Sequence, residues 1–139
     1  MIDPLDGLLG YQLRRASVVM MADLSSALEP LGLRPTEASV LLAIRANPRA
    51  TLSGLCRLLG VQRANMTPMV AALAARGFVD RSAGDDGRSH AVALSREGMA
   101  MAGRAADAIA AHEARHLPTL SVADRERLIA TLRAVREAS

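Results

Sequence analysis

The stretch GFVDRSAGDDGRSHAVALSREG, residues 77–98, carries the strongest structural signal in this sequence. Residues 78–81 and 90–94 are short segments able to form strands, and the Asp86-Gly87 pair between them is typical of a β-hairpin turn. Ser95 then stands where the N-cap of a following helix is expected. The stretch therefore predicts a two-stranded hairpin between helices, with Arg88 projecting from its tip.

Two short helical segments lie immediately upstream, at about residues 52–59 and 63–76. In each, apolar residues recur at the i, i+3, i+4, i+7 spacing of a helix with one buried face. The tight turn between them, at residues 60–62, is typical of a helix-turn-helix, whose second helix enters the major groove of DNA. A hairpin directly after that helix predicts a winged helix. The apolar positions are Leu52, Leu55, Cys56 and Leu59, then Met66, Met69, Val70 and Leu73.

The second of these helices has a surface suited to DNA. At its start, Gln62, Arg63 and Asn65 carry the groups that suit adenine, guanine and adenine respectively. Arg88 at the hairpin tip could enter a minor groove. The same residues would also fit a plain amphipathic helix followed by a solvated surface turn. The outward positions of the helix are Ala64, Asn65, Thr67, Pro68, Ala71 and Ala72, most of them small enough for a close DNA backbone.

Longer helical segments flank this centre. The chain is rich in Ala and Leu, which favour helices, and Tyr11 and Phe78 are its only aromatic residues. A first helix over about 5–28 would be roughly 35 Å long, too long for one small core to cover. We therefore expect a mainly α fold with a small β-hairpin wing. The other helices are predicted at about 36–46, 95–116 and 121–137.

Positive charge is concentrated in the centre of the chain. Between Arg45 and Arg96 there are eight arginines and three acids, a net +5, whereas the rest holds nine arginines and eleven acids, a net −2. A local basic excess of this kind is typical of a nucleic-acid binder. Every basic residue apart from the histidines is arginine, which suits bidentate contacts with phosphate or guanine.

Several features point to the cytoplasm. No run of about 18 apolar residues predicts a membrane span, and the N-terminal residues do not resemble a secretory signal. The single cysteine, Cys56, cannot form an internal disulfide, which fits a reducing compartment. Because Cys56 lies on a buried stripe, we expect it to pack in the core and not to act as a redox sensor.

One motif favours a different class of function. His112-Glu113-Ala114-Arg115-His116 matches H-E-x-x-H, in which two histidines bind zinc and the glutamate acts as general base of a hydrolase. Glu126 or Glu137 could supply a third ligand. Both histidines also extend an apolar stripe, so packing alone would place them there. We expect no catalytic residue, metal or cofactor; a non-catalytic metal or a pH-sensitive histidine pair in a dimer interface is the alternative.

The central stretch resembles the wing signature of the MarR family of bacterial regulators. Residues 77–81 (GFVDR), 86–88 (DGR) and 92–98 (VALSREG) follow its pattern of Gly-apolar-apolar-x-Arg, Asp-x-Arg and Leu-Thr/Ser-x-x-Gly. Residues 31–33 (LGL) and 55–61 (LCRLLGV) also fit. The resemblance covers essentially the whole chain. It implies one domain over 1–139, with dimerisation helices at 1–30 and 96–139 around a winged-helix DNA-binding region at 35–95.

The resemblance also implies partners and residue roles. The protein is expected to be a homodimeric repressor of a pseudo-palindromic site on double-stranded DNA, released by a small aromatic or phenolic acid. By motif position, Arg88 is the minor-groove arginine, and Asp86 and Arg81 order the wing. The base-reading stretch is expected at Gln62, Arg63, Ala64, Asn65, Thr67 and Pro68, and an effector pocket at Tyr11, Gln12 and Arg15.

Two positions depart from the family pattern. Pro68 stands inside the recognition helix, where the family often has a polar or basic residue, and it removes a backbone N–H. Gln62 replaces the Ser or Thr common at the helix start, which predicts a weaker N-cap.

Overall fold

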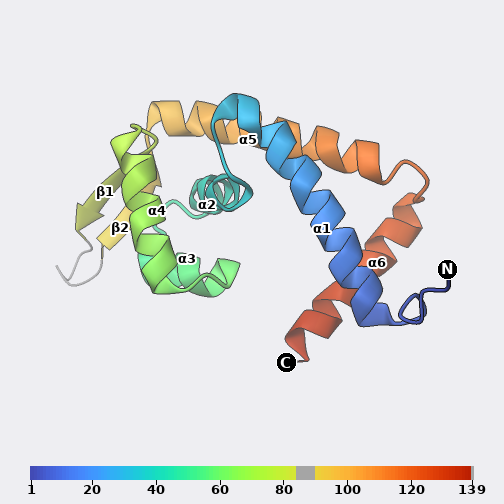
Figure 1. Ribbon diagram of the computed structural model, residues 1–139. Helices are drawn as coiled ribbons and strands as arrows, with labels where there is room; N and C mark the ends of the chain where they lie inside the picture. Colours follow the sequence, from blue (N-terminus) through green and yellow to red (C-terminus); the bar gives the residue numbers. More distant parts are fainter. Residues whose placement is uncertain (84–89, 139) are drawn as a thin grey trace.

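The computed structural model describes residues 1–83 and 90–138. The predicted order of four helices, a hairpin and two further helices is confirmed, with one 3-10 turn added (Figure 1). The first helix begins four residues later than expected, and the second begins at Pro35, whose ring suits the first helical position. The elements are α1 (Leu9–Leu28), η1 (Glu29–Leu31), α2 (Pro35–Ala46), α3 (Leu52–Leu59), α4 (Arg63–Ala75), β1 (Val79–Ala83), β2 (His90–Leu94), α5 (Arg96–His116) and α6 (Val122–Glu137).

Helices α2, α3 and α4 and the hairpin enclose the core together with the first half of α5 (Figure 1). The stripe predicted for α4 is confirmed, because Met66, Val70 and Leu73 are fully buried and Met69 is half-buried. In α3, Leu55 is buried, while its other stripe residues are half-buried against the same core. The side chains that anchor α3 and α4 in the core thus lie on one face of each helix, as their spacing in the sequence predicts.

The hairpin gains a third chain segment that the sequence pattern did not indicate. Strands β1 and β2 pair antiparallel, with Val79 opposite Leu94 and Ala83 opposite His90. On the other side of β2, Thr51 forms an isolated bridge with Ala91, and the Val92 amide donates to the Ala50 carbonyl at 2.8 Å. The base of the wing is therefore tied to the residues that begin α3.

The start of α5 rests directly on the start of β1. The Ser95 hydroxyl accepts a hydrogen bond from the Gly98 amide at 3.0 Å, which confirms Ser95 as the N-cap. The Ser95 amide donates to the Phe78 carbonyl, also at 3.0 Å. A Cβ atom added to Gly98 would lie 2.0 Å from that carbonyl oxygen. The glycine of the signature thus lets α5 lie closer to the Phe78 backbone than a residue with a side chain would allow.

Helices α1 and α6 extend away from this core (Figure 1). Leu28 is the one buried residue of α1, and every residue of α6 is exposed. Among the described residues, none of the helices is both long and apolar enough to cross a membrane. As expected for so long a helix, the rest of the chain leaves most of the surface of α1 uncovered. Large apolar side chains at least 39% exposed on these two helices are Leu9, Val18, Val19, Met21, Val122, Leu128, Ile129, Leu132 and Val135.

Candidate DNA-binding surface, pocket and histidine cluster

The helix-turn-helix has the local geometry expected of a tight turn. The Thr51 hydroxyl caps α3 by accepting from the Gly54 amide at 3.1 Å. Gly60 ends α3 in the left-handed region, at φ 65°, and the Val61 amide donates back to the Cys56 carbonyl. Helix α4 begins two residues after Val61. The turn thereby orients α4 relative to α3 through backbone bonds.

The start of α4 is an exposed polar surface. Gln62 is its N-cap and makes no side-chain cap hydrogen bond, which confirms the weak cap expected there. The Arg63 guanidinium donates to the Ser53 hydroxyl of α3 at 2.7 Å and stays exposed. Ala64, Asn65, Thr67 and Pro68 are exposed as well. These residues are brought to one open face, as a base-reading role requires, and that role remains a prediction.

Pro68 lies inside a continuous α4 and does not end it. Since proline has no N–H, the carbonyl of Ala64 loses its usual intrahelical donor at this point. Both residues are exposed, so water can satisfy that carbonyl. The helix therefore tolerates the proline on its exposed, outward face.

A groove beside α4 contains residues that the sequence pattern did not single out. It has a volume of about 590 Å³ and runs between the start of α2 and α4, with Arg34 and Thr36 on one side and Gln62, Asn65 and Pro68 on the other. The buried Glu37 carboxylate accepts from the Arg34 amide at 2.8 Å and so caps α2. The Arg34 side chain is 78% exposed. The Glu three residues after an N-cap is a capping-box spacing that could have indicated this helix start.

The basic excess of the central segment lies on the surface. Arg88 and Asp86, predicted to contact the minor groove and to order the wing, lie outside the described residues. Arg81, the other predicted wing residue, is exposed on β1. All described arginines of the segment are exposed: Arg45, Arg49, Arg57, Arg63, Arg76, Arg81 and Arg96.

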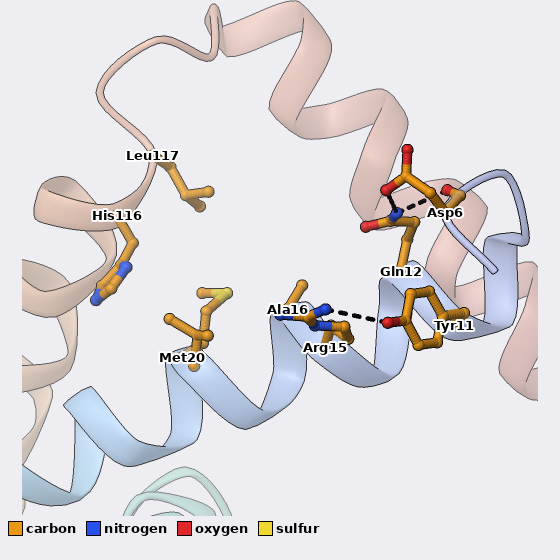
Figure 2. A pocket seen from close by; sticks show the side chains of 9 residues that line it. Asp6, Tyr11, Gln12, Arg15, Ala16, Met20, His116 and Leu117 are labelled. Atoms are coloured by element: carbon orange, nitrogen blue, oxygen red, sulfur yellow. Dashed lines mark hydrogen bonds between the residues drawn. The ribbon is translucent and has the colours of Figure 1, made fainter. Parts of the chain in front are cut away.

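A pocket of about 570 Å³ lies between α1 and the end of α5 (Figure 2). Tyr11, Gln12 and Arg15, expected to line an effector pocket, are all on its wall. The Arg15 guanidinium donates to the Tyr11 hydroxyl at 3.0 Å, and the Gln12 amide to the Asp6 carboxylate at 2.9 Å. The remaining lining is mainly apolar: Ala16, Val19, Met20, His116 and Leu117. The pocket thus has a polar end and an apolar centre.

The histidine motif is not arranged as in a zinc hydrolase. Glu113, which would be the general base, is bound to Arg125 of α6. Glu126 and Glu137, the two residues considered as a third ligand, are not in the cluster of potential ligands around the histidines. Asp23 of α1 occupies that place, with its carboxylate 2.7 Å from His116 and 3.4 Å from His112.

Cys56 is half-buried and packs against the hydrophobic core. Its position fits the expected packing role.

Comparisons with known proteins agree with the winged-helix geometry. A family model described as MarR family matches residues 31–89. An HTH-type transcriptional repressor of Mycobacterium tuberculosis is 34% identical over 117 residues, covering 84% of either chain. The solved structure of the transcriptional repressor CouR bound to a 23-mer DNA duplex has a TM-score of 0.91 at 33% identity, covering 98% of this chain and 97% of that one. CouR bound to p-coumaroyl-CoA has a TM-score of 0.86 at 31% identity, covering 98% of this chain and 96% of that one.

Proposed function

The chain belongs to the MarR family of winged-helix transcriptional regulators, and from that premise we propose that it is a cytoplasmic homodimeric repressor released from its operator by a small aromatic acid or its thioester. The family is one of regulators, so the hydrolase alternative is rejected. The observation that carries the proposal is the open polar start of α4, at Gln62, Arg63 and Asn65, within a surface of exposed arginines. CouR, the similar repressor, is bound to DNA in one structure and to p-coumaroyl-CoA in another.

Dimerisation is supported by the exposure of α1 and α6. Leu128, Leu132 and Val135 are spaced i, i+4, i+7 on α6 and are each at least 40% exposed. An apolar stripe of this kind is expected to be covered by a partner. In a symmetric dimer the two copies of α4 would enter successive major grooves, about 34 Å apart, on a pseudo-palindromic site.

DNA contacts divide between two elements. In this proposal Gln62, Arg63 and Asn65 read base edges in the major groove, and Arg88 enters the minor groove. Arg63 donates to Ser53 in the absence of DNA, and on binding its guanidinium would transfer to a guanine. The small side chains of Ala64, Thr67 and Pro68 would let the DNA backbone approach.

The DNA assignment is tested by fluorescence anisotropy with duplexes from the region upstream of the protein's own gene. Arg63→Ala and Arg88→Ala should each weaken binding about 10-fold or more, the value of one specific base or groove contact. Ser53→Ala removes the internal hydrogen bond and keeps the guanidinium, so it should bind as the unaltered protein does. Arg133→Ala on α6 removes the same charge far from the winged helix and should have no effect.

Affinity should also fall steeply with salt, because phosphate contacts release counterions. If Arg63→Ala and Arg88→Ala both bind the duplex as tightly as the unaltered protein, the assignment of the reading surface is wrong.

Effector release is argued from the pocket between α1 and α5. Its volume of about 570 Å³ lies in the usual range for small-ligand sites. Arg15 would pair with a carboxylate or phosphate, and Met20 and Leu117 would contact an aromatic ring. A ligand there would bind one relative placement of the helices better than another and shift the dimer away from its DNA-binding form.

A thermal-shift screen of phenolic acids and their coenzyme A thioesters, p-coumaroyl-CoA included, tests the pocket. A ligand that binds the folded dimer should raise the unfolding midpoint. Arg15→Ala should abolish that rise, whereas Arg14→Ala, at the neighbouring position outside the pocket lining, should leave it intact. Equal rises in both variants would place the ligand elsewhere.

A further inference from the structure

Three potential metal ligands from two helices meet where α1 crosses the end of α5. They are Asp23 on α1 and His112 and His116 on α5, and their candidate ligand atoms all lie within 4.8 Å of one another. The i, i+4 spacing places both imidazoles on one helix face, with ring centroids 4.7 Å apart. Both Nε2 atoms lie near the same Asp23 oxygen, Oδ2, at 3.4 Å for His112 and 2.7 Å for His116.

His112 is the unusual member of this cluster. Its side chain is 3% exposed, and its Nε2 atom is buried without a hydrogen-bond partner. Buried polar atoms are almost always paired, because an unpaired one has lost its water and gained nothing in exchange. Burial of the ring leaves this nitrogen 3.4 Å from the Asp23 carboxylate and out of reach of water.

We propose that Asp23, His112 and His116 form a binding site for a divalent transition-metal ion of the zinc class. Two imidazoles and one carboxylate are a ligand set that zinc takes in proteins, with a fourth position left open. Tetrahedral coordination with bonds of about 2.0–2.1 Å separates ligand atoms by roughly 3.3 Å. The Asp23–His112 separation of 3.4 Å already matches, and the Asp23–His116 pair needs to open by about 0.6 Å from its 2.7 Å.

Arg115 competes with a cation for this site. Its guanidinium donates to the same Asp23 oxygen at 3.1 Å, but the side chain is 60% exposed and free to turn toward solvent. Entry of the ion would replace this ion pair and give the His112 nitrogen a partner. Because the ligands come from α1 and α5, the ion would cross-link the two helices that border the pocket, whose wall includes His116. Metal binding by these three residues does not require that the proposed effector bind in that pocket.

The test uses the untagged chain, residues 1–139, after treatment with a chelator. Titration calorimetry with Zn²⁺ should give one ion per chain, and Co²⁺ should give the visible absorption of a tetrahedral nitrogen and oxygen site. His116→Ala, which leaves the buried His112 in place, should weaken binding by at least about 100-fold, since even supporting residues of metal sites change affinity 10- to 100-fold. Asp23→Asn should also weaken it.

Two further variants separate a metal site from a structural ion pair. Arg115→Ala should tighten Zn²⁺ binding, because it removes the competing cation, whereas loss of a merely structural contact would not. Glu126→Gln on α6 removes an acid outside the cluster and should leave binding unchanged. Far-ultraviolet circular dichroism of the metal-free variants establishes that they are folded. Absence of Zn²⁺ binding by the unaltered protein, or equal binding by folded His116→Ala, would overturn the proposal.

Discussion

Replacing Gly98 by alanine tests how tightly the wing is joined to α5. The new Cβ would lie 2.0 Å from the Phe78 carbonyl oxygen and 2.9 Å from its carbon, where ordinary contact begins at 3.4 Å. Both atoms belong to the backbone and cannot turn aside. The start of α5 or the start of β1 must therefore retreat by about 1.4 Å, which breaks the 3.0 Å hydrogen bond from the Ser95 amide to Phe78.

The expected cost combines three terms. Overpacking of a tight backbone contact costs about 1–3 kcal/mol, and the lost hydrogen bond about 0.5–1.5 kcal/mol. Alanine favours the helix over glycine by about 1 kcal/mol, which offsets part of this. We expect a net destabilisation of about 2 kcal/mol, equivalent to a fall in the midpoint of thermal unfolding of roughly 6–10 °C for a chain of this size.

Gly103 provides the matched control in the same helix. A Cβ added there has no described atom outside the helix backbone within 4 Å, so Gly103→Ala should raise the midpoint by a few degrees. Both variants are to be melted by circular dichroism at one fixed protein concentration, because stability of a dimer depends on concentration. If Gly98→Ala melts at or above the temperature of the unaltered protein, the close approach of α5 to Phe78 is refuted.

Three further predictions concern other parts of the molecule. Leu132→Glu on α6 should convert the dimer to a monomer in light scattering and reduce operator affinity by at least about 10-fold; a variant that stays dimeric would contradict the assigned interface. Pro68→Ala restores a backbone N–H in α4 and should raise the free energy of unfolding by about 1–3 kcal/mol in a urea titration, and no gain would mean that α4 has adapted to the proline. Hydrogen bonds from His116 and then Arg115 lower the pKa of Asp23, so its contribution to stability is complete above its ordinary pKa of 3.8 and is lost as the pH falls through the lowered value. Asp23→Asn should therefore lower stability at neutral pH and flatten its decline in acid; an unchanged acid profile would show that the carboxylate contributes nothing.

Much of the fold could be predicted because its signals are local. Thr51, Ser95 and Ser121 each cap the helix that follows them, and a cap needs only the next three residues. The apolar spacing of α3 and α4 likewise depends on neighbours in the same helix. The exposed face of α4 follows from its buried face, so the outward positions from Ala64 to Pro68 could be named as well.

The features that were missed depend on contacts between distant parts of the chain. Asp23 and His112 are 89 positions apart in the sequence, so only the crossing of α1 and α5 brings them together. The bridge from Thr51 to Ala91 is a single residue pair, too short to produce a periodic pattern. Tyr11, Gln12 and Arg15 could be grouped because they share one helix. The spacing of residues could not predict that His116, from another helix, lines the same pocket.

The complete exposure of α6 makes the lifetime of the protein depend on its concentration in the cell. An isolated helix of 16 residues is marginal in water, so in a lone chain α6 would fray and expose its backbone to proteases. Association protects that backbone, and the fraction of associated chains rises with their concentration. Newly made chains would then be degraded faster when they are scarce than when they are abundant. Repression by such a protein would begin sharply, at the abundance where pairing outpaces proteolysis.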